Sequence, residues 1–265
     1  MATYLDNILD VHRDRVANDH RSLDQLIEKA QRSDGELSPV RGFGRALESA
    51  DGLAVIAEIK RRSPSKGSLN ADLDPANLAA QYVEGDATCL SVLTDEAHFG
   101  GSASDLRQAR SEVSVPVLRK DFTVGPADVV DARLMGADAV LLIVAALDQA
   151  ELRDFFALAT ELDLDCLLET HDEREVERAM ELEPSIIGVN QRDLTTFEVD
   201  TSRALRVGSM LDSSVIKVAE SGVEGPDDAA ELANGGYQAI LVGESVVTSN
   251  NASESVRNLR MAGRR

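Results

Sequence analysis

Charged and amide side chains recur in this sequence directly after short apolar runs, where buried strands would end. These residues are Glu58, Lys60, Lys120, Glu169, Asn190 and Glu220. A charge at the end of a buried strand is costly to desolvate unless it is paired or used. Carboxylates and ammonium groups held together supply general acids and bases, and an ammonium group stabilises a developing oxyanion. The pattern therefore predicts an acid–base catalytic site.

The use of lysine supports this interpretation. Only five of the 27 basic residues are lysine, and four of the five lie in the apolar runs or in the loops just after them: Lys60, Lys66, Lys120 and Lys217. A desolvated lysine can lose its proton, whereas arginine effectively cannot. Simple ion pairing would tolerate arginine, so the pattern favours proton chemistry over a ring of compensating ion pairs.

The elements that must position these residues are eight apolar runs, at 53–57, 89–93, 115–118, 139–144, 165–168, 186–189, 214–218 and 239–242. Continuous runs of leucine and β-branched residues predict strands buried on both faces, as in parallel sheets. Amphipathic stretches separate the runs, and eight strand–helix units predict an α/β fold, a (β/α)8 TIM barrel. Residues 1–50 look helical. We therefore expect one domain over 1–265, with an N-terminal helical extension at 1–50 and the barrel at 51–265.

A phosphate site is predicted at the ends of the last two runs, which lead into Ser221 and Gly222 and into Gly243, Glu244 and Ser245. In a TIM barrel the active site lies at the carboxyl ends of the strands, and these two loops often bind phosphate. Glycine lets backbone N–H groups approach the anion. With a net charge of −20, a phosphorylated substrate needs a local cationic pocket.

The composition excludes several classes of protein. A net charge of −20 repels nucleic acid and anionic membranes. No run approaches the roughly 20 apolar residues of a membrane helix. The first residues lack the basic head and apolar run of a secretory signal, so we expect a soluble cytoplasmic protein. The acidic, lysine-poor composition also suggests a halophilic source.

Metal ions and cofactors are not expected. None of the histidines, His12, His20, His98 and His171, forms a pair at a spacing suited to a metal. The glycine loops GxGxxG and GxxxxGK[ST] of nucleotide sites are absent. Cys89 and Cys166 lie in apolar runs and read as buried hydrophobic residues. His171 follows Glu169 by two positions and is either an active-site acid or a polar loop residue.

Residues 57–67 (AEIKRRSPSKG) resemble the AEIKxxSPSKG signature of the indole-3-glycerol-phosphate synthase family. Further resemblances follow in order at 93–95 (LTD), 99–102 (FGGS), 118–122 (LRKDF), 168–170 (LET), 188–194 (GVNQRDL), 219–222 (AESG) and 242–245 (VGES). The family is one of TIM-barrel enzymes of tryptophan biosynthesis with an N-terminal helical extension. The resemblance implies ring closure, decarboxylation and dehydration of 1-(2-carboxyphenylamino)-1-deoxyribulose 5-phosphate to indole-3-glycerol phosphate, without metal or cofactor.

The resemblance also implies residue roles. Lys120 would be the general acid during ring closure, and Glu169 the base or acid of dehydration. Lys60 would assist proton transfer, with Glu58 and Asn190 orienting it. The substrate-binding residues implied by the resemblance and by the phosphate loops are Ser63, Phe122, Arg192, Glu220, Ser221, Gly222, Gly243, Glu244 and Ser245. Phe122 would pack on the aromatic ring, and Arg192 would lie near an anionic end. Because Glu244 follows the phosphate-loop glycine, its carboxylate would have to point away from phosphate.

Three other interpretations remain. Phosphoribosylanthranilate isomerase, another phosphosugar barrel of the same pathway, would share the phosphate loops but not the pairing of Lys120 with Glu169. An aldolase would form a Schiff base on Lys120 or Lys217, which borohydride trapping would reveal. A non-catalytic phosphosugar binder would have no use for an acid–base set. The sequence indicates a monomer by default and leaves assembly with pathway enzymes open.

Overall fold

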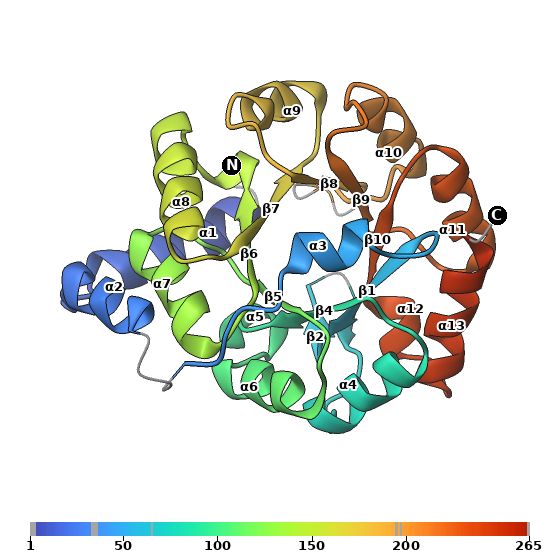
Figure 1. Ribbon diagram of the computed structural model, residues 1–265, viewed down its shortest axis with the longest axis horizontal. Helices are drawn as coiled ribbons and strands as arrows, with labels where there is room; N and C mark the ends of the chain where they lie inside the picture. The colour runs from blue at the N-terminus through green and yellow to red at the C-terminus, as the bar shows by residue number, and fades with distance from the viewer. Residues whose placement is uncertain (1–3, 33–36, 65, 194–195, 197, 264–265) are drawn as a thin grey trace.

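Eight parallel strands close into a barrel in this computed structural model, which describes residues 4–32, 37–64, 66–193, 196 and 198–263 (Figure 1). Around the barrel the order is β1-β10-β9-β8-β7-β6-β5-β4. The strands are β1 (Ala54–Ile59), β4 (Cys89–Leu93), β5 (Val117–Lys120), β6 (Ala139–Ile143), β7 (Asp165–Thr170), β8 (Ile186–Asn190), β9 (Ile216–Glu220) and β10 (Ala239–Val242). Each corresponds to one predicted run, so the predicted (β/α)8 barrel is confirmed.

Period-two alternation along each strand decides which side chains enter the barrel. In β1, Ala54 and Ile56 belong to the inner core, whereas Val55 and Ala57 pack outward against the helices. Continuing the alternation places Glu58 on the inner side of the barrel, at the end formed by the carboxyl ends of the strands, which is called the upper rim. In β5, Lys120 lies two positions after the inner-core residue Leu118, and in β7, Glu169 lies two positions after Leu167, so both side chains also point inward. The strands therefore present their terminal charged residues to one shared space.

Helices cover the outside of the barrel: α4 (Pro75–Glu84), α6 (Ala103–Glu112), α7 (Pro126–Met135), α8 (Gln149–Glu161), α9 (Glu173–Met180), α10 (Thr201–Gly208), α11 (Pro226–Asn234) and α13 (Ala252–Ala262). Their ends follow local chemistry. Asp74 caps α4 by accepting from the backbone N–H groups of Ala76 and Asn77, with Pro75 in the first turn. Gly136 ends α7 in the left-handed region, at φ 91°.

Short elements occupy the upper rim. They are the hairpin of β2 (Arg62–Ser63) and β3 (Gly67–Ser68), the helices α5 (Glu96–Phe99) and α12 (Glu244–Val247), and the 3-10 turn η1 (Val144–Ala146). None of the helices in the described ranges has both the length and the hydropathy needed to span a bilayer.

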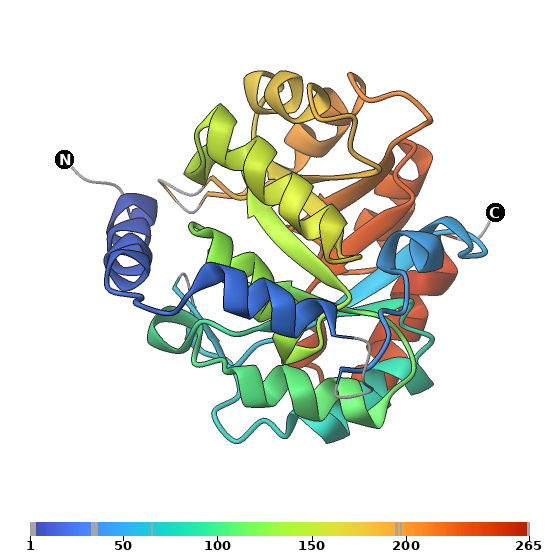
Figure 2. The same cartoon turned by 60° about the vertical axis from the view of Figure 1, so that its left-hand side comes forward.

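The N-terminal extension forms α1 (Tyr4–Ala17), α2 (Leu23–Gln31) and α3 (Phe43–Glu48). Helix α3 lies across the lower barrel opening, where Phe43 and Leu47 join the inner core (Figure 1). The backbone N–H of Gly44 donates to Asp165 Oδ2 at 2.9 Å. Helix α1 lies at the opposite end of the barrel (Figure 2). The extension thus covers both ends.

Candidate active site

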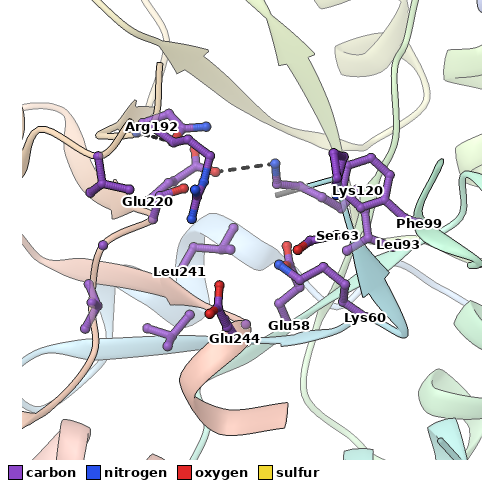
Figure 3. A pocket seen from close by; sticks show the side chains of 18 of the residues that line it. Glu58, Lys60, Ser63, Leu93, Phe99, Lys120, Arg192, Glu220, Leu241 and Glu244 are labelled. Carbon is purple, nitrogen blue, oxygen red and sulfur yellow. Dashed lines mark hydrogen bonds and ion pairs between the residues drawn. The ribbon is translucent and has the colours of Figure 1, made fainter. Parts of the chain in front are cut away.

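A cavity of about 710 Å³ opens at the carboxyl ends of the strands. Every residue proposed from the sequence for catalysis or substrate binding lines it: Glu58, Lys60, Ser63, Lys120, Phe122, Glu169, Asn190, Arg192, Glu220, Ser221, Gly222, Gly243, Glu244 and Ser245. Figure 3 shows that the labelled members of this set, among them Glu58, Lys120 and Glu220, come from different strands and face one space. The structure therefore brings the predicted site together, while the individual roles stay predictions.

The centre of the site is a lysine between two buried carboxylates. Lys120 Nζ lies 2.9 Å from Glu169 Oε2 and 3.5 Å from Glu220 Oε2. Burial alone would lower the pKa of Lys120, but Glu169, Glu220 and Glu58 raise it above the ordinary lysine value. Lys120 is therefore a charged ammonium group at neutral pH, which suits a proton donor and an oxyanion partner.

The two carboxylates are driven apart in proton affinity. Burial would raise the pKa of Glu169, yet the charges of Lys120 and His171 hold it well below its usual range. Burial and the negative charge of Glu169 raise the pKa of Glu220 well above the ordinary glutamate value. Two neighbouring carboxyl groups with opposite shifts are the arrangement that separates an ionised base from a protonated acid.

The Asn190 side-chain amide and a backbone N–H group form the hydrogen bonds that hold Glu169 in place. Asn190 Nδ2 donates to Glu169 Oε1 at 3.1 Å, and Asn190 Oδ1 accepts from the backbone N–H of Arg192 at 3.0 Å. Lys60 is held separately, with Nζ 2.7 Å from Glu58 Oε1. Glu58 therefore contacts Lys60, whereas Asn190 contacts Glu169. Which side chain each of them orients in the reaction stays a prediction.

Two glycines make room for the buried carboxylates. A Cβ on Gly188 would overlap Glu220 Oε1, and a Cβ on Gly243 would overlap Glu58 Oε1. Neither position has a positive φ, so the requirement is space and not backbone conformation. Any larger residue at either position would displace a carboxylate of the site.

The predicted phosphate corner gathers the ends of β9 and β10 with the loop after β1. Ser221 and Gly222 have φ values of 64° and 73°, and Gly243 begins α12. Lys66 Nζ pairs with Glu244 Oε1 at 3.3 Å. The Glu244 side chain points into the cavity in Figure 3. The expectation that its carboxylate points away from a bound phosphate stays a prediction. In this conformation the ion pair with Lys66 holds the carboxylate there.

The opposite wall is apolar. Phe122 and Phe99 have ring centroids 6.3 Å apart, and Leu93, Leu141 and Ile143 line the same cavity. Helix α1 adds Tyr4, Leu5 and Ile8 to the lining. The sequence analysis did not predict this contribution. The helical spacing of Tyr4, Ile8 and His12 marks one face of α1, but that face alone does not reveal which surface it covers.

A buried histidine–aspartate contact anchors α1 over the cavity. His12 Nε2 lies 2.8 Å from Asp95 Oδ2, and His98 Nδ1 lies 3.0 Å from the same oxygen. Burial would raise the pKa of Asp95, but hydrogen bonds from both histidines hold it well below its usual range. The His12 ring also lies 5.2 Å from the Phe122 ring, centroid to centroid.

His12, Asp95 and His98 place one possible ligand atom each within 4.8 Å of one another, which is a candidate metal-binding geometry. The expectation of no suitable pairing missed this cluster because His12 and Asp95 are 83 positions apart. Both ring nitrogens already contact one carboxylate oxygen, so hydrogen bonding accounts for the cluster. The absence of a metal in the chemistry stays a prediction.

Lys217 lies outside the cavity. Its Nζ donates to the carbonyl oxygen of Gly208 at 2.9 Å, at the end of α10. A Schiff-base lysine needs a lowered pKa, but the pKa of Lys120 is raised. The structure thus offers no support for an aldolase on either lysine. The motif positions Ser65 and Leu194 lie outside the described residues.

The chain is similar to known proteins over nearly its whole length. The family profile described as indole-3-glycerol phosphate synthase matches residues 5–259. An "Indole-3-glycerol phosphate synthase 1" of Streptomyces coelicolor is 48% identical over 261 residues, which is 98% of this chain and 95% of that protein. An "Indole-3-glycerol phosphate synthase" of Paenarthrobacter aurescens is 46% identical over 242 residues, 91% of this chain and 89% of that protein.

Among solved structures, a thiamine phosphate pyrophosphorylase from Pyrococcus furiosus superposes with a TM-score of 0.60. It covers 80% of this chain and 96% of its own, at 17% sequence identity. At this identity the likeness supports the barrel fold alone.

Proposed function

The chain belongs to the indole-3-glycerol phosphate synthase family, and from this premise we propose how its residues divide the reaction between them. The protein is a carboxy-lyase of tryptophan biosynthesis that acts on a phosphorylated small molecule. It converts 1-(2-carboxyphenylamino)-1-deoxyribulose 5-phosphate to indole-3-glycerol phosphate with release of carbon dioxide and water.

Lys120 is the general acid of ring closure. As the aryl carbon attacks the ribulose carbonyl carbon, negative charge develops on the carbonyl oxygen, and the Lys120 ammonium group stabilises and protonates it. Loss of carbon dioxide then returns its bonding electrons to the ring. The observation that carries this assignment is the 2.9 Å contact between Lys120 and Glu169.

Glu169 serves the dehydration. Its low pKa keeps it ionised, so it can take the proton from the carbon next to the new hydroxyl-bearing centre while the hydroxyl leaves as water. Lys60, held by Glu58 at 2.7 Å, supplies a second proton donor in the cavity. Asn190 keeps Glu169 aimed at the substrate through its 3.1 Å hydrogen bond.

The two ends of the substrate have matching walls. The phosphate binds at Ser63, Ser221, Gly222, Gly243 and the backbone of 244–245, where Glu244 must turn aside and release Lys66. The aromatic ring packs on Phe122, and Arg192 binds the carboxylate.

The reaction is tested by following indole fluorescence and carbon dioxide release together. One carbon dioxide per indole product supports the assignment. Substrate binding without turnover would indicate a phosphosugar binder, and turnover of phosphoribosylanthranilate instead would indicate the isomerase.

A halophilic origin is also proposed, because the chain carries a net charge of −20 and only five lysines. A carboxylate-rich surface repels itself when salt is removed, since screening weakens as ionic strength falls. Unfolding on dialysis to low salt, followed by circular dichroism, supports the proposal. Full stability in low salt would contradict it.

We further propose a cytoplasmic monomer that folds as a single domain over 1–265 and binds no nucleic acid. The large apolar side chains exposed in the described ranges, Val11, Val199, Met210 and Met261, belong to four different segments and form no continuous run along one helix. Light scattering on the purified protein tests the monomer, and a single urea transition tests the single domain.

A further inference from the structure

We propose that His171 is a positioning residue: a charged imidazolium that holds Glu169 from outside the cavity and lets Lys120 part from it during proton transfer. This inference rests on the proposed role of Glu169. His171 follows β7 directly and is not one of the described residues that line the cavity. It acts on the substrate only through Glu169.

The geometry places the ring between two carboxylates. Nε2 lies 3.4 Å from Glu169 Oε1, and Nδ1 lies 3.0 Å from Glu175 Oε2 in the first turn of α9. The backbone N–H of His171 donates to that same Glu175 oxygen at 2.8 Å. The His171 side chain is only 11% exposed. Nδ1 is hydrogen-bonded to Glu175, whereas Nε2 faces Glu169 at ion-pair distance without a hydrogen bond. A neutral ring could donate to only one of these carboxylates, so the arrangement favours the doubly protonated form.

The electrostatics agree with this protonation state. Burial would lower the pKa of His171, but Glu169 and Glu175 raise it to about 10. The ionisable groups that face Glu169 are Lys120 from β5, Glu220 from β9 and His171 itself, and Asn190 from β8 adds an uncharged donor. Two cations therefore act on one carboxylate from different sides.

Each cation engages a different oxygen of Glu169. Lys120 contacts Oε2, whereas His171 and Asn190 contact Oε1. When Lys120 gives its proton to the substrate, Glu169 loses one of its two counter-charges. His171 supplies the other, so Glu169 remains ionised and able to accept the proton removed from the substrate during dehydration. The ring thereby keeps acid and base separate during turnover.

The test compares His171→Gln with His171→Lys. Loss of the charge raises the pKa of Glu169, so His171→Gln should move the acidic limb of the pH–kcat profile up by about one unit. It should also lower kcat about tenfold with KM nearly unchanged, because Glu169 then has no counter-charge once Lys120 has given up its proton. His171→Lys keeps a cation and should restore much of the limb. His20→Gln, an exposed histidine beyond α1, is the matched control.

Glu175→Gln adds a second, independent measurement. It leaves the contact with Glu169 intact but removes one carboxylate from His171, so it should move the same limb in the same direction by less. If His171→Gln loses only stability to urea and keeps the wild-type limb and kcat, the positioning role is wrong. An inactive wild-type protein would instead reject the proposed function itself, which separates the two failures.

Discussion

Replacing Lys120 by methionine removes the ammonium group while keeping a side chain of similar length. The change leaves Glu169 with Asn190 and His171 as partners, and Glu220 without its 3.5 Å contact. The substrate oxyanion then lacks both its proton donor and its nearest positive charge.

The expected loss follows from the general acid role. Such a role contributes about 10²–10⁴ in rate, which corresponds to roughly 3–5 kcal/mol of transition-state stabilisation. We therefore expect kcat of Lys120→Met to fall by at least about a hundredfold. Deleting one partner of a buried ion pair can cost about 3–5 kcal/mol of stability when the remaining charge is left unpaired. Because Glu169 retains two partners, the folding loss should be smaller and the variant should fold.

Indole fluorescence in high salt measures the rate, and urea unfolding checks the fold of the variant. Lys217→Met is the matched control, since Lys217 also lies in a barrel strand but donates to Gly208 outside the cavity. The control should keep wild-type kcat. If folded Lys120→Met retains more than about a tenth of the wild-type kcat, the reasoning that makes it the acid is refuted.

Three further outcomes are expected. Asp95→Asn should lower the urea midpoint at pH 7, and the difference from wild type should shrink below about pH 4. The reason is that a carboxyl group whose pKa is lowered by folding contributes its full stabilisation only above the pKa that it has in the unfolded chain. A constant difference down to pH 3 would contradict this. Gly188→Ala should displace Glu220, cost about 1–3 kcal/mol in urea unfolding and lower kcat. The control Gly225→Ala, where a Cβ meets no atom within 4 Å, should keep the wild-type kcat, although it replaces the N-cap glycine of α11. Dialysis against EDTA should leave kcat unchanged, and activity restored only by added zinc would show a metal requirement.

The strands were predictable because burial on both faces leaves an unbroken apolar signal. The predicted run at 165–168 nevertheless covers only the first part of β7, which continues through Glu169 to Thr170. At these positions the backbone still pairs with β8, although the side chains carry the chemistry. A hydropathy pattern ends where the strand residues become polar, whereas the backbone hydrogen-bond pairing shows that the strand continues.

The contribution of α1 could not be predicted in the same way. Tyr4 and Ile8 reach the cavity through long-range contacts of α1, such as that of His12 with Asp95, and no local pattern encodes a contact across 83 positions. The hairpin of β2 and β3 escaped prediction for a different reason. Its residues Arg62, Ser63, Gly67 and Ser68 carry no strand propensity, and two short segments of two residues leave no periodic signal.

The position of α3 across the lower barrel opening has a consequence for the order of folding. The barrel closes when β1 pairs with β10, with Ala54 beside Ala239, so the first strand made on the ribosome waits for the last. Until then the lower opening that receives Phe43 and Leu47 is not complete. Closing so long a loop is entropically costly and slow. A nascent chain therefore carries Phe43 and Leu47 without their complete barrel core until the last strand, β10, has been made.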